Sequence, residues 1–349
     1  MAKRIKYRVN PDFNQPGLFD FDTPSAAAQP QTETPLEQLD FTVNIAEKFT
    51  PAPQPAAPDD ALPAVERDTL NFISFGSGSS GNCSYIGDST GGFLVDAGVD
   101  PEQVWGTLRR HCIGPEKVRG ICLTHDHSDH VRYVYALVRK NPHIGIYCTP
   151  KVLNGMLRRH SLSRRIKDYH RPIYKEFPFN LGNFEITAFE VSHDGSDNAG
   201  YFITHGDHTF AIATDLGCIT DRVDHYMRQA RYIMIESNYD AEMLANGPYP
   251  IHLRGRIAAP NGHMDNVATA AFLRDIYTPQ LTHVFLCHLS KDNNTPETAL
   301  RANREALASV GVSVVDRPVV PGSDDSTRTV RLVALPRYDA SPMYTLRID

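Results

Sequence analysis

The chain has 349 residues, of which 41% are apolar and 22% are charged, and its net charge is −6. This length holds one large domain or two ordinary ones, and no run approaches the roughly 18 apolar residues of a membrane helix. The acidic balance excludes wholesale electrostatic binding to nucleic acid, so any such contact needs a local patch. The six cysteines contain no C-x-x-C pair and no apolar segment follows the basic start, so we expect a cytoplasmic protein.

Residues 1–67 are predicted to form a disordered tail, followed by one folded domain over 68–349. The tail holds ten of the 25 prolines, among Ala, Gln and Thr, with almost no apolar periodicity. Within it, Gln15 is followed by Leu18 and Phe19. An exposed Q-x-x-L-F resembles the peptide that binds the bacterial sliding clamp, although so short a pattern also recurs by chance in linkers.

The folded part is organised around residues 124–131, THDHSDHV. Three histidines and two aspartates fall between His125 and His130. The residues before them, 118–124, predict a buried strand, and 131–139 have helical spacing. The histidines are therefore expected on a strand-to-helix loop. A lone histidine is usually an ordinary core or surface residue, but imidazole and carboxylate at this density suit zinc, manganese or iron.

Other strands repeat the pattern of an apolar run that ends in a ligand-type side chain. We expect strands at 71–75, 92–96, 144–148, 184–191, 200–204, 209–215, 232–235 and 281–287 and two more near the C-terminus, with helices at 150–157, 267–276 and 296–307. The residues at or just after five of these strands are Asp96, His193, Asp215, Glu236 and His288. Such strand ends build a site along one edge of a sheet. Asp96 would orient a metal-bound histidine or simply cap the next turn.

Several segments are candidates to hold phosphate. The loop 76–82 offers glycine amides with Ser79, Ser80 and Asn82, although a tight hairpin turn explains the loop equally well. Arg254 and Arg256 are further candidates. The run 158–171 is densely basic, which in an acidic chain indicates either a phosphate-backbone contact or a solvated helix face.

The ordered motifs resemble those of the metallo-β-lactamase superfamily. They are GSGSSGN, LVDAG, THDHSDH, SHD, TDLG, ESN, GHMDN and CHLSKDNN, and their combination looks like the WalJ/YycJ-type proteins, thought to be DNA exonucleases. The resemblance covers about 71–310. It implies an α/β (α+β) fold, the αββα sandwich of two mixed sheets with helices outside.

The resemblance also implies two divalent metal ions, Zn²⁺ or alternatively Mn²⁺. The ligands implied for the first ion are His125, His127 and His193. Those implied for the second are Asp129, His130 and His288, with Asp215 bridging the two ions. His263 and Glu236 fall where nuclease branches of the family assist the leaving group, while a supporting or capping role for His263 stays open.

The function implied is a dinuclear-metal phosphodiesterase, in particular a DNA exonuclease of replication or repair. A metal-bridging hydroxide oriented by Asp129 would attack phosphorus. One alternative is a small-molecule hydrolase that cleaves a cyclic phosphodiester, lactone or thioester, because the same site serves those reactions. The other is a non-catalytic adaptor tethered to the clamp, against which the complete set of ligands argues.

Overall fold

A computed structural model of the protein describes residues 69–319 and 328–348. The predicted tail, with Gln15, Leu18 and Phe19, lies outside the described residues. Within those two ranges, no helix combines the length and the apolar character that crossing a membrane requires.

The first sheet contains seven strands. They are β1 (Thr69–Gly76), β2 (Cys83–Asp88), β3 (Gly91–Val95), β4 (Val118–Cys122), β5 (Gly145–Cys148), β6 (His170–Pro172) and β15 (Tyr344–Arg347). Their spatial order is β15-β1-β2-β3-β4-β5-β6, and β3 to β6 run parallel.

The second sheet contains eight strands. They are β7 (Phe179–Leu181), β8 (Phe184–Glu190), β9 (Ala199–His205), β10 (His208–Ala213), β11 (Tyr232–Glu236), β12 (His283–Cys287), β13 (Ser313–Val315) and β14 (Thr329–Ala334). Their order is β13-β14-β12-β11-β10-β9-β8-β7. The strands β10, β11, β12 and β14 are parallel, and β8 runs the same way because β9 is antiparallel to both β8 and β10.

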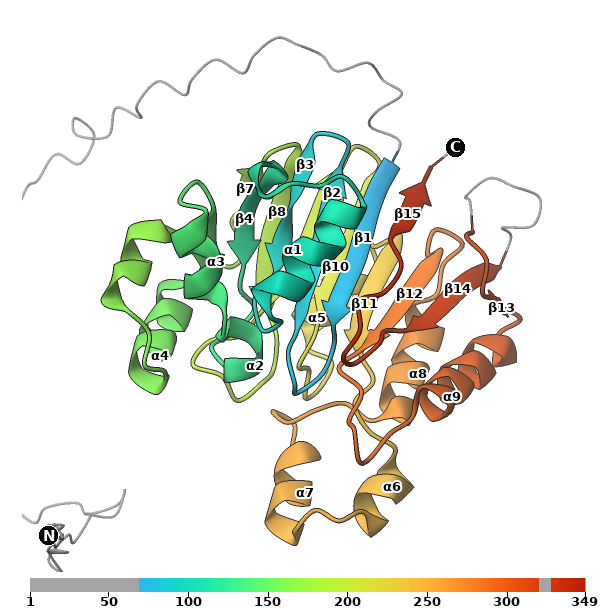
Figure 1. Cartoon of the computed structure of the whole chain (residues 1–349). Coiled ribbons are helices and arrows are strands. Elements are labelled where there is room, and N and C mark those ends of the chain that lie inside the picture. The colour runs from blue at the N-terminus through green and yellow to red at the C-terminus, as the bar shows by residue number, and fades with distance from the viewer. Residues whose placement is uncertain (1–68, 320–327, 349) are drawn as a thin grey trace, which may run out of the picture. The chain divides into compact units, whose positions relative to one another are not determined.

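The helices of the described chain fall into three positions (Figure 1). Those beside the first sheet are α1 (Pro101–Arg110), α2 (Ser128–Val131), α3 (Val134–Lys140) and α4 (Pro150–Arg159), with the short 3₁₀ turns η3 (Pro115–Lys117) and η4 (Arg164–Tyr169). Those beside the second sheet are α5 (Asp221–Met227), α8 (Asn266–Ile276) and α9 (Pro296–Ser309). The remaining pair, α6 (Ala241–Asn246) and α7 (Ile251–Ile257), project beyond the end of the sheets.

Apolar side chains divide the molecule into four layers. Between the sheets, Phe72 of β1 packs on Phe285 of β12, with ring centroids 4.7 Å apart. A second cluster joins the outer face of the first sheet to α1, α3 and α4. A third joins the outer face of the second sheet to α5, α8 and α9. This arrangement is an αββα sandwich, which confirms the predicted fold class.

The parallel strands bring their carboxyl ends to one edge of the sandwich. In the first sheet, β3 and β4 lead into Asp96 and His125. In the second sheet, β10, β11 and β12 end beside one another and lead into Asp215, Glu236 and His288. Polar groups that are far apart in the sequence therefore converge at this edge, as the strand-end pattern predicted.

The helix predicted at 131–139 is broken into α2 and α3. In a continuous helix, the Tyr133 amide would bond to the Asp129 carbonyl. Instead the Tyr133 amide donates to Ala97 O at 2.9 Å, and Asp129 O accepts from the Asn82 amide at 2.8 Å. The prediction of a single helix was wrong because long-range contacts take these backbone groups.

The end of the chain also differs from the prediction of two closing strands. In the described part of the chain three strands follow α9, and the last, β15, pairs with β1 in the first sheet. The extra strand β13 has only three residues, too short to show alternation. The strand β2 was not predicted, because all six of its residues are buried and polar side chains interrupt its apolar run.

His283 in β12 makes stability depend on pH. Burial, and then Arg331, lower the pKa of His283 to about 3, against roughly 6.5 for an unfolded histidine. The contribution of the neutral His283 side chain to the free energy of unfolding is complete above pH 6.5. It is lost as the pH falls towards 3, because in this range only the unfolded chain takes up a proton at His283. We expect His283→Leu to reduce the slope of unfolding free energy against pH between 6 and 4 by up to about 1.4 kcal/mol per pH unit. Denaturant titrations of both proteins measure the slope, and equal slopes would contradict this account.

Candidate metal centre

Two groups of potential ligands meet at the strand ends and share one carboxylate. His125, His127, His193 and Asp215 form the first group, and Asp129, His130, Asp215 and His288 form the second. Within each group the ligand atoms lie within 4.8 Å of one another. The structure thus brings together all seven residues that the sequence proposed as ligands.

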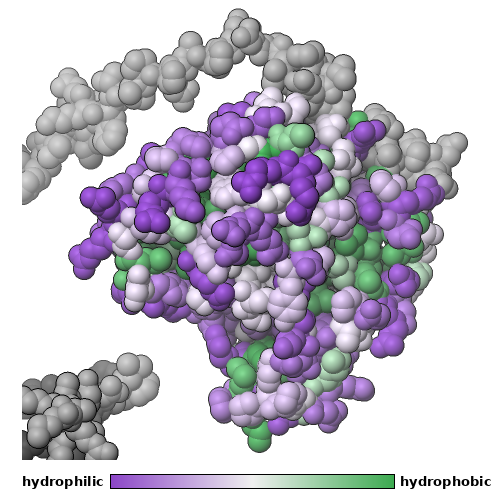
Figure 2. Space-filling view, viewed as in Figure 1, coloured by the Kyte–Doolittle hydropathy of each residue, from purple (hydrophilic) through white to green (hydrophobic). Residues whose placement is uncertain are grey.

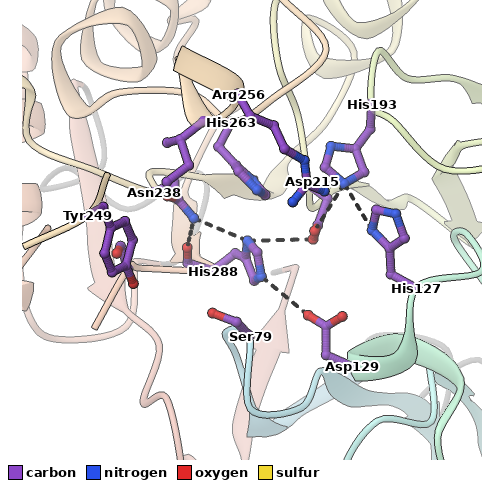
Figure 3. A pocket seen from close by; sticks show the side chains of 12 residues that line it. Ser79, His127, Asp129, His193, Asp215, Asn238, Tyr249, Arg256, His263 and His288 are labelled. Atoms are coloured by element: carbon purple, nitrogen blue, oxygen red, sulfur yellow. Dashed lines mark hydrogen bonds and ion pairs between the residues drawn. The ribbon is translucent and has the colours of Figure 1, made fainter. Parts of the chain in front are cut away.

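Asp215 turns one carboxylate oxygen to each group. Its Oδ2 lies 3.8 Å from His125 Nε2 and 3.5 Å from His193 Nε2. Its Oδ1 lies 3.2 Å from His130 Nε2 and 3.6 Å from His288 Nδ1. In Figure 3, Asp215, His193 and His288 face a common space together with His127 and Asp129, and Asp129 lies opposite Asp215. Each oxygen of Asp215 therefore faces a different group of potential ligands.

The donor atoms at this site fit divalent cations. The Nε2 atoms of His125 and His288 and the Oδ1 atom of Asp194 are buried and make no hydrogen bond within the described chain. Buried polar atoms normally have partners, so these atoms are arranged to accept a ligand. The set consists of imidazole nitrogen and carboxylate oxygen without thiolate, which suits zinc, manganese or iron.

Asp96 orients one of the ligands. His130 Nδ1 donates to Asp96 Oδ2 at 2.7 Å, so the lone pair of Nε2, which lies 2.9 Å from Asn82 Nδ2, is the one that could bind a cation. The Thr124 amide and hydroxyl also donate to Asp96, so the carboxylate is fixed from two sides. Of the two roles considered for Asp96, its contacts favour orienting a histidine over capping a turn.

Charges in the cluster shift pKa values in opposite directions. Burial lowers the pKa of His125 well below its ordinary value. Burial opposes the charged form of His288 as well, but Asp215 and the other carboxylates around it outweigh burial and raise its pKa to about 10. For Asp215, burial favours the neutral acid, but His288 and His130 lower its pKa well below the ordinary range. Without a metal, the cluster therefore keeps Asp215 ionised and His288 protonated. A cation that binds at the site would displace protons from the histidines.

Glu236 connects this centre to His263. Its Oε1 accepts from His288 Nδ1 at 2.7 Å and from His263 Nδ1 at 2.8 Å. Its Oε2 accepts from the Leu216 amide at 2.6 Å and the Met264 amide at 3.3 Å. Glu236 is fully buried, so it holds both rings and does not itself reach a substrate.

A cavity of about 190 Å³ opens over the centre. Two of the five residues predicted to bind substrate, Ser79 and Arg256, line it together with His263. The other three predicted residues do not line this cavity. Ser80 lines a neighbouring cavity, and the buried Asn82 side chain donates to Asp129 Oδ2 at 3.3 Å. Arg254 donates to the Ala245 carbonyl.

Further residues in and beside the cavity were not identified from the sequence. Asp194 accepts from Arg256 Nε at 2.8 Å, and its Oδ1 lies 3.3 Å from His127 Nε2. Asn238 and Tyr249 line the cavity (Figure 3). Asp194 could have been identified from the sequence, because it directly follows the candidate ligand His193. The residues around Tyr249 do not distinguish it from any other tyrosine in a loop.

Comparisons with known proteins agree with this architecture. A family model described as the beta-lactamase superfamily domain matches residues 92–288. The chain is 32% identical over 251 residues to exodeoxyribonuclease YycJ of Bacillus anthracis, covering 70% of this chain and 92% of that protein. This chain belongs to the metallo-β-lactamase superfamily and is of the WalJ/YycJ type. Exodeoxyribonuclease WalJ of Streptococcus pneumoniae serotype 2 (strain D39) is 32% identical over 240 residues, covering 68% of this chain and 89% of that protein.

Solved structures share the fold at much lower identity. The metallo-β-lactamase fold protein YhfI from Bacillus subtilis has a TM-score of 0.55 at 15% identity, covering 80% of this chain and 99% of that chain. Zn²⁺-bound PqqB from Methylobacterium extorquens has a TM-score of 0.51 at 14% identity, covering 78% and 99%. Because the chain belongs to this superfamily and its relatives are exodeoxyribonucleases, it is a metal-dependent hydrolase.

Removing the charge of Asp96 is expected to weaken metal binding. Asp96→Asn keeps the size of the side chain and tolerates the left-handed backbone at this position, where φ is 63°. We expect the affinity for zinc or manganese to fall about tenfold or more, because a ligating imidazole loses its charged partner. Competition with a chelating dye measures the affinity. Asp100→Asn is the control, since Asp100 only caps α1, and equal affinities for all three proteins would contradict the role of Asp96.

Proposed function

We propose that the protein is a DNA exonuclease whose centre binds two divalent ions, zinc or manganese. The observation that carries the proposal is Asp215, which presents one oxygen to each ligand group. Centres with two cations catalyse in-line displacement at phosphorus. DNA as the substrate is inferred from the two exodeoxyribonucleases, which align with this chain over 92% and 89% of their lengths.

Asp129 is proposed both to bind metal and to orient the nucleophile. The two ions would supply an activated water and neutralise charge on the phosphate oxygens. The Asp129 side chain is 16% exposed at the cavity, so it is accessible to that water as a hydrogen-bond acceptor. Its Oδ2 lies 3.6 Å from His130 Nε2 and 3.7 Å from His288 Nε2, which fixes the carboxylate between its neighbours.

His263 is proposed to donate a proton to the departing sugar oxygen, with Glu236 as its positioning residue. His263 lines the cavity, and its side chain is 19% exposed. Burial disfavours its charged form, but Glu236 outweighs burial and raises the pKa of His263. Since Nδ1 is held by Glu236, the ring presents Nε2 to a substrate.

Ser79 and Arg256 are proposed to contact the substrate at the rim. The Arg256 side chain is 60% exposed and is held by Asp194 Oδ2 at 2.7 Å from Nη2. A guanidinium held in this way at the mouth of the cavity can donate charge-assisted hydrogen bonds to a phosphate oxygen of the substrate.

The proposal extends to a cytoplasmic enzyme of DNA replication or repair. Recruitment to a sliding clamp through Gln15, Leu18 and Phe19 stays a prediction, because those residues lie outside the described part of the chain.

Digestion of end-labelled DNA tests the proposed function. We expect the full chain with manganese or zinc to release mononucleotides from one end of single- or double-stranded DNA. EDTA should abolish the release, and His127→Ala should reduce it by about 10³-fold or more, because metal-assisted attack is lost. The control is His252→Ala, which changes an exposed histidine of α7. Intact DNA combined with cleavage of bis-p-nitrophenyl phosphate or a lactone would overturn the DNA assignment in favour of a small-molecule hydrolase.

The role of His263 predicts a dependence on the leaving group. His263→Ala should lower kcat on DNA by about 10² to 10⁴-fold, since a sugar alkoxide needs a proton on departure. The loss should be at least about tenfold smaller on bis-p-nitrophenyl phosphate, because nitrophenolate departs without one. Steady-state kinetics on both substrates measure the two losses. Equal losses would show that His263 supports the metal site and is not a proton donor.

A further inference from the structure

The densest basic run of the sequence forms the C-terminal end of α4 and the turn η4, in a segment that contacts the ligand loop at Asp126. This α4–η4 basic surface consists of Arg158, Arg159, Arg164, Arg165 and Lys167, all of them exposed. The single acidic residue in 158–168 is Asp168. Figure 2 shows hydrophilic side chains along the left edge of the molecule, where Figure 1 places α4.

Most of these cations have no acidic partner. Arg159 Nε lies 3.4 Å from Asp126 Oδ2. In the described part of the chain, none of the other four forms an ion pair. Like charges in such a cluster repel one another, so the cluster attracts anions such as phosphate although the chain as a whole has a net charge of −6.

The surface is anchored to the loops that carry the ligands. The helix α4 packs so closely there that a Cβ on Gly155 would lie 2.1 Å from Asp126 Oδ2 and 2.5 Å from Ser196 Oγ. Asp126 stands between His125 and His127 in the sequence. Arg159 follows Gly155 by four residues, a rise of about 6 Å along a helix. The first basic side chains therefore lie about one helical turn from the ligand loop.

His160 provides a second anchor at the end of α4. Its Nε2 donates to Asp126 O at 2.7 Å. The turn that leads from α4 to η4 is thereby fixed to the same loop as the helix. Because α4 and the residue that follows it both contact Asp126, the C-terminal end of α4 occupies a defined position relative to the ligand loop.

We propose that the α4–η4 basic surface binds the phosphodiester backbone of a DNA strand whose end lies in the metal centre. This inference rests on the proposed function and adds the contact that would retain the strand between cleavage steps. Arg256 stands at the cavity mouth on α7, and Figure 1 shows α4 and α7 on different sides of the ligand-bearing edge. A strand in the cavity would thus meet cations both at its reacting end and along its length.

The test neutralises four cations of the surface in the full chain, as R158Q/R164Q/R165Q/K167Q. Arg159 is retained because it pairs with Asp126. The probe is a labelled poly(dT) strand of about 20 nucleotides, with KM measured from 50 to 300 mM salt. We expect KM at low salt to rise about tenfold or more. The slope of log KM against log salt should fall by about 3, since each phosphate contact on single-stranded DNA contributes roughly 0.7.

The control protein carries the same charge change elsewhere, as R109Q/R110Q/R301Q/R304Q on exposed positions of α1 and α9. Hydrolysis of bis-p-nitrophenyl phosphate, which is too small to span both regions, reports whether each variant still folds and binds metal. A wild-type KM and salt slope in the surface variant would overturn the inference, as would equal changes in the control. If the wild type cleaves bis-p-nitrophenyl phosphate but no DNA, the proposed function fails first and this inference fails with it.

Discussion

The structure depends on compensating the charge of Asp215, a carboxylate buried where the strand ends converge. Burial of an unpaired carboxylate costs several kcal/mol, so the surrounding groups must offset it. Here imidazoles approach both oxygens, the nearest being His130 Nε2 at 3.2 Å. The backbone adds strain, because Asp96, Asp215 and His288 all adopt positive φ, of 63°, 39° and 53°. The packed sandwich on either side maintains this strained and charged arrangement. Such an arrangement is typical of a functional site and fits the binding of metal ions.

The two sheets contribute different parts of the centre. The first sheet supplies the histidine loop after β4 and the carboxylate of Asp96 that orients it. The second sheet supplies Asp215 and Glu236. Glu236 contacts both His263 and His288, so it couples the proposed proton donor to a proposed metal ligand. The site is therefore complete only when the layers pack together. Packing of α4 on Asp126 places the proposed DNA-binding surface next to the ligand loop.

Sequence reasoning brought together the candidate ligands that the structure places side by side, but it predicted their surroundings poorly. The resemblance to the superfamily implied the seven candidate ligands, and local patterns explain only why they meet, because parallel strands bring their carboxyl ends to one edge. The break after α2, by contrast, depends on hydrogen bonds from the Asn82 amide and to the Ala97 carbonyl, which no local pattern reveals. The same holds for Glu236, whose two histidine partners are 27 and 52 residues away. Asn82 looked like a substrate-binding residue of a glycine loop, but its side chain is buried against Asp129.

The most direct test of this account is the metal content of the purified chain, measured by inductively coupled plasma mass spectrometry after equilibration with zinc or manganese. We predict about two ions per chain for the wild type, the number that a bridging carboxylate serves. His125→Ala should retain about one, because the ligand group of Asp129, His130 and His288 remains. A wild type that saturates at one ion, or at none, would contradict a centre in which Asp215 binds two cations.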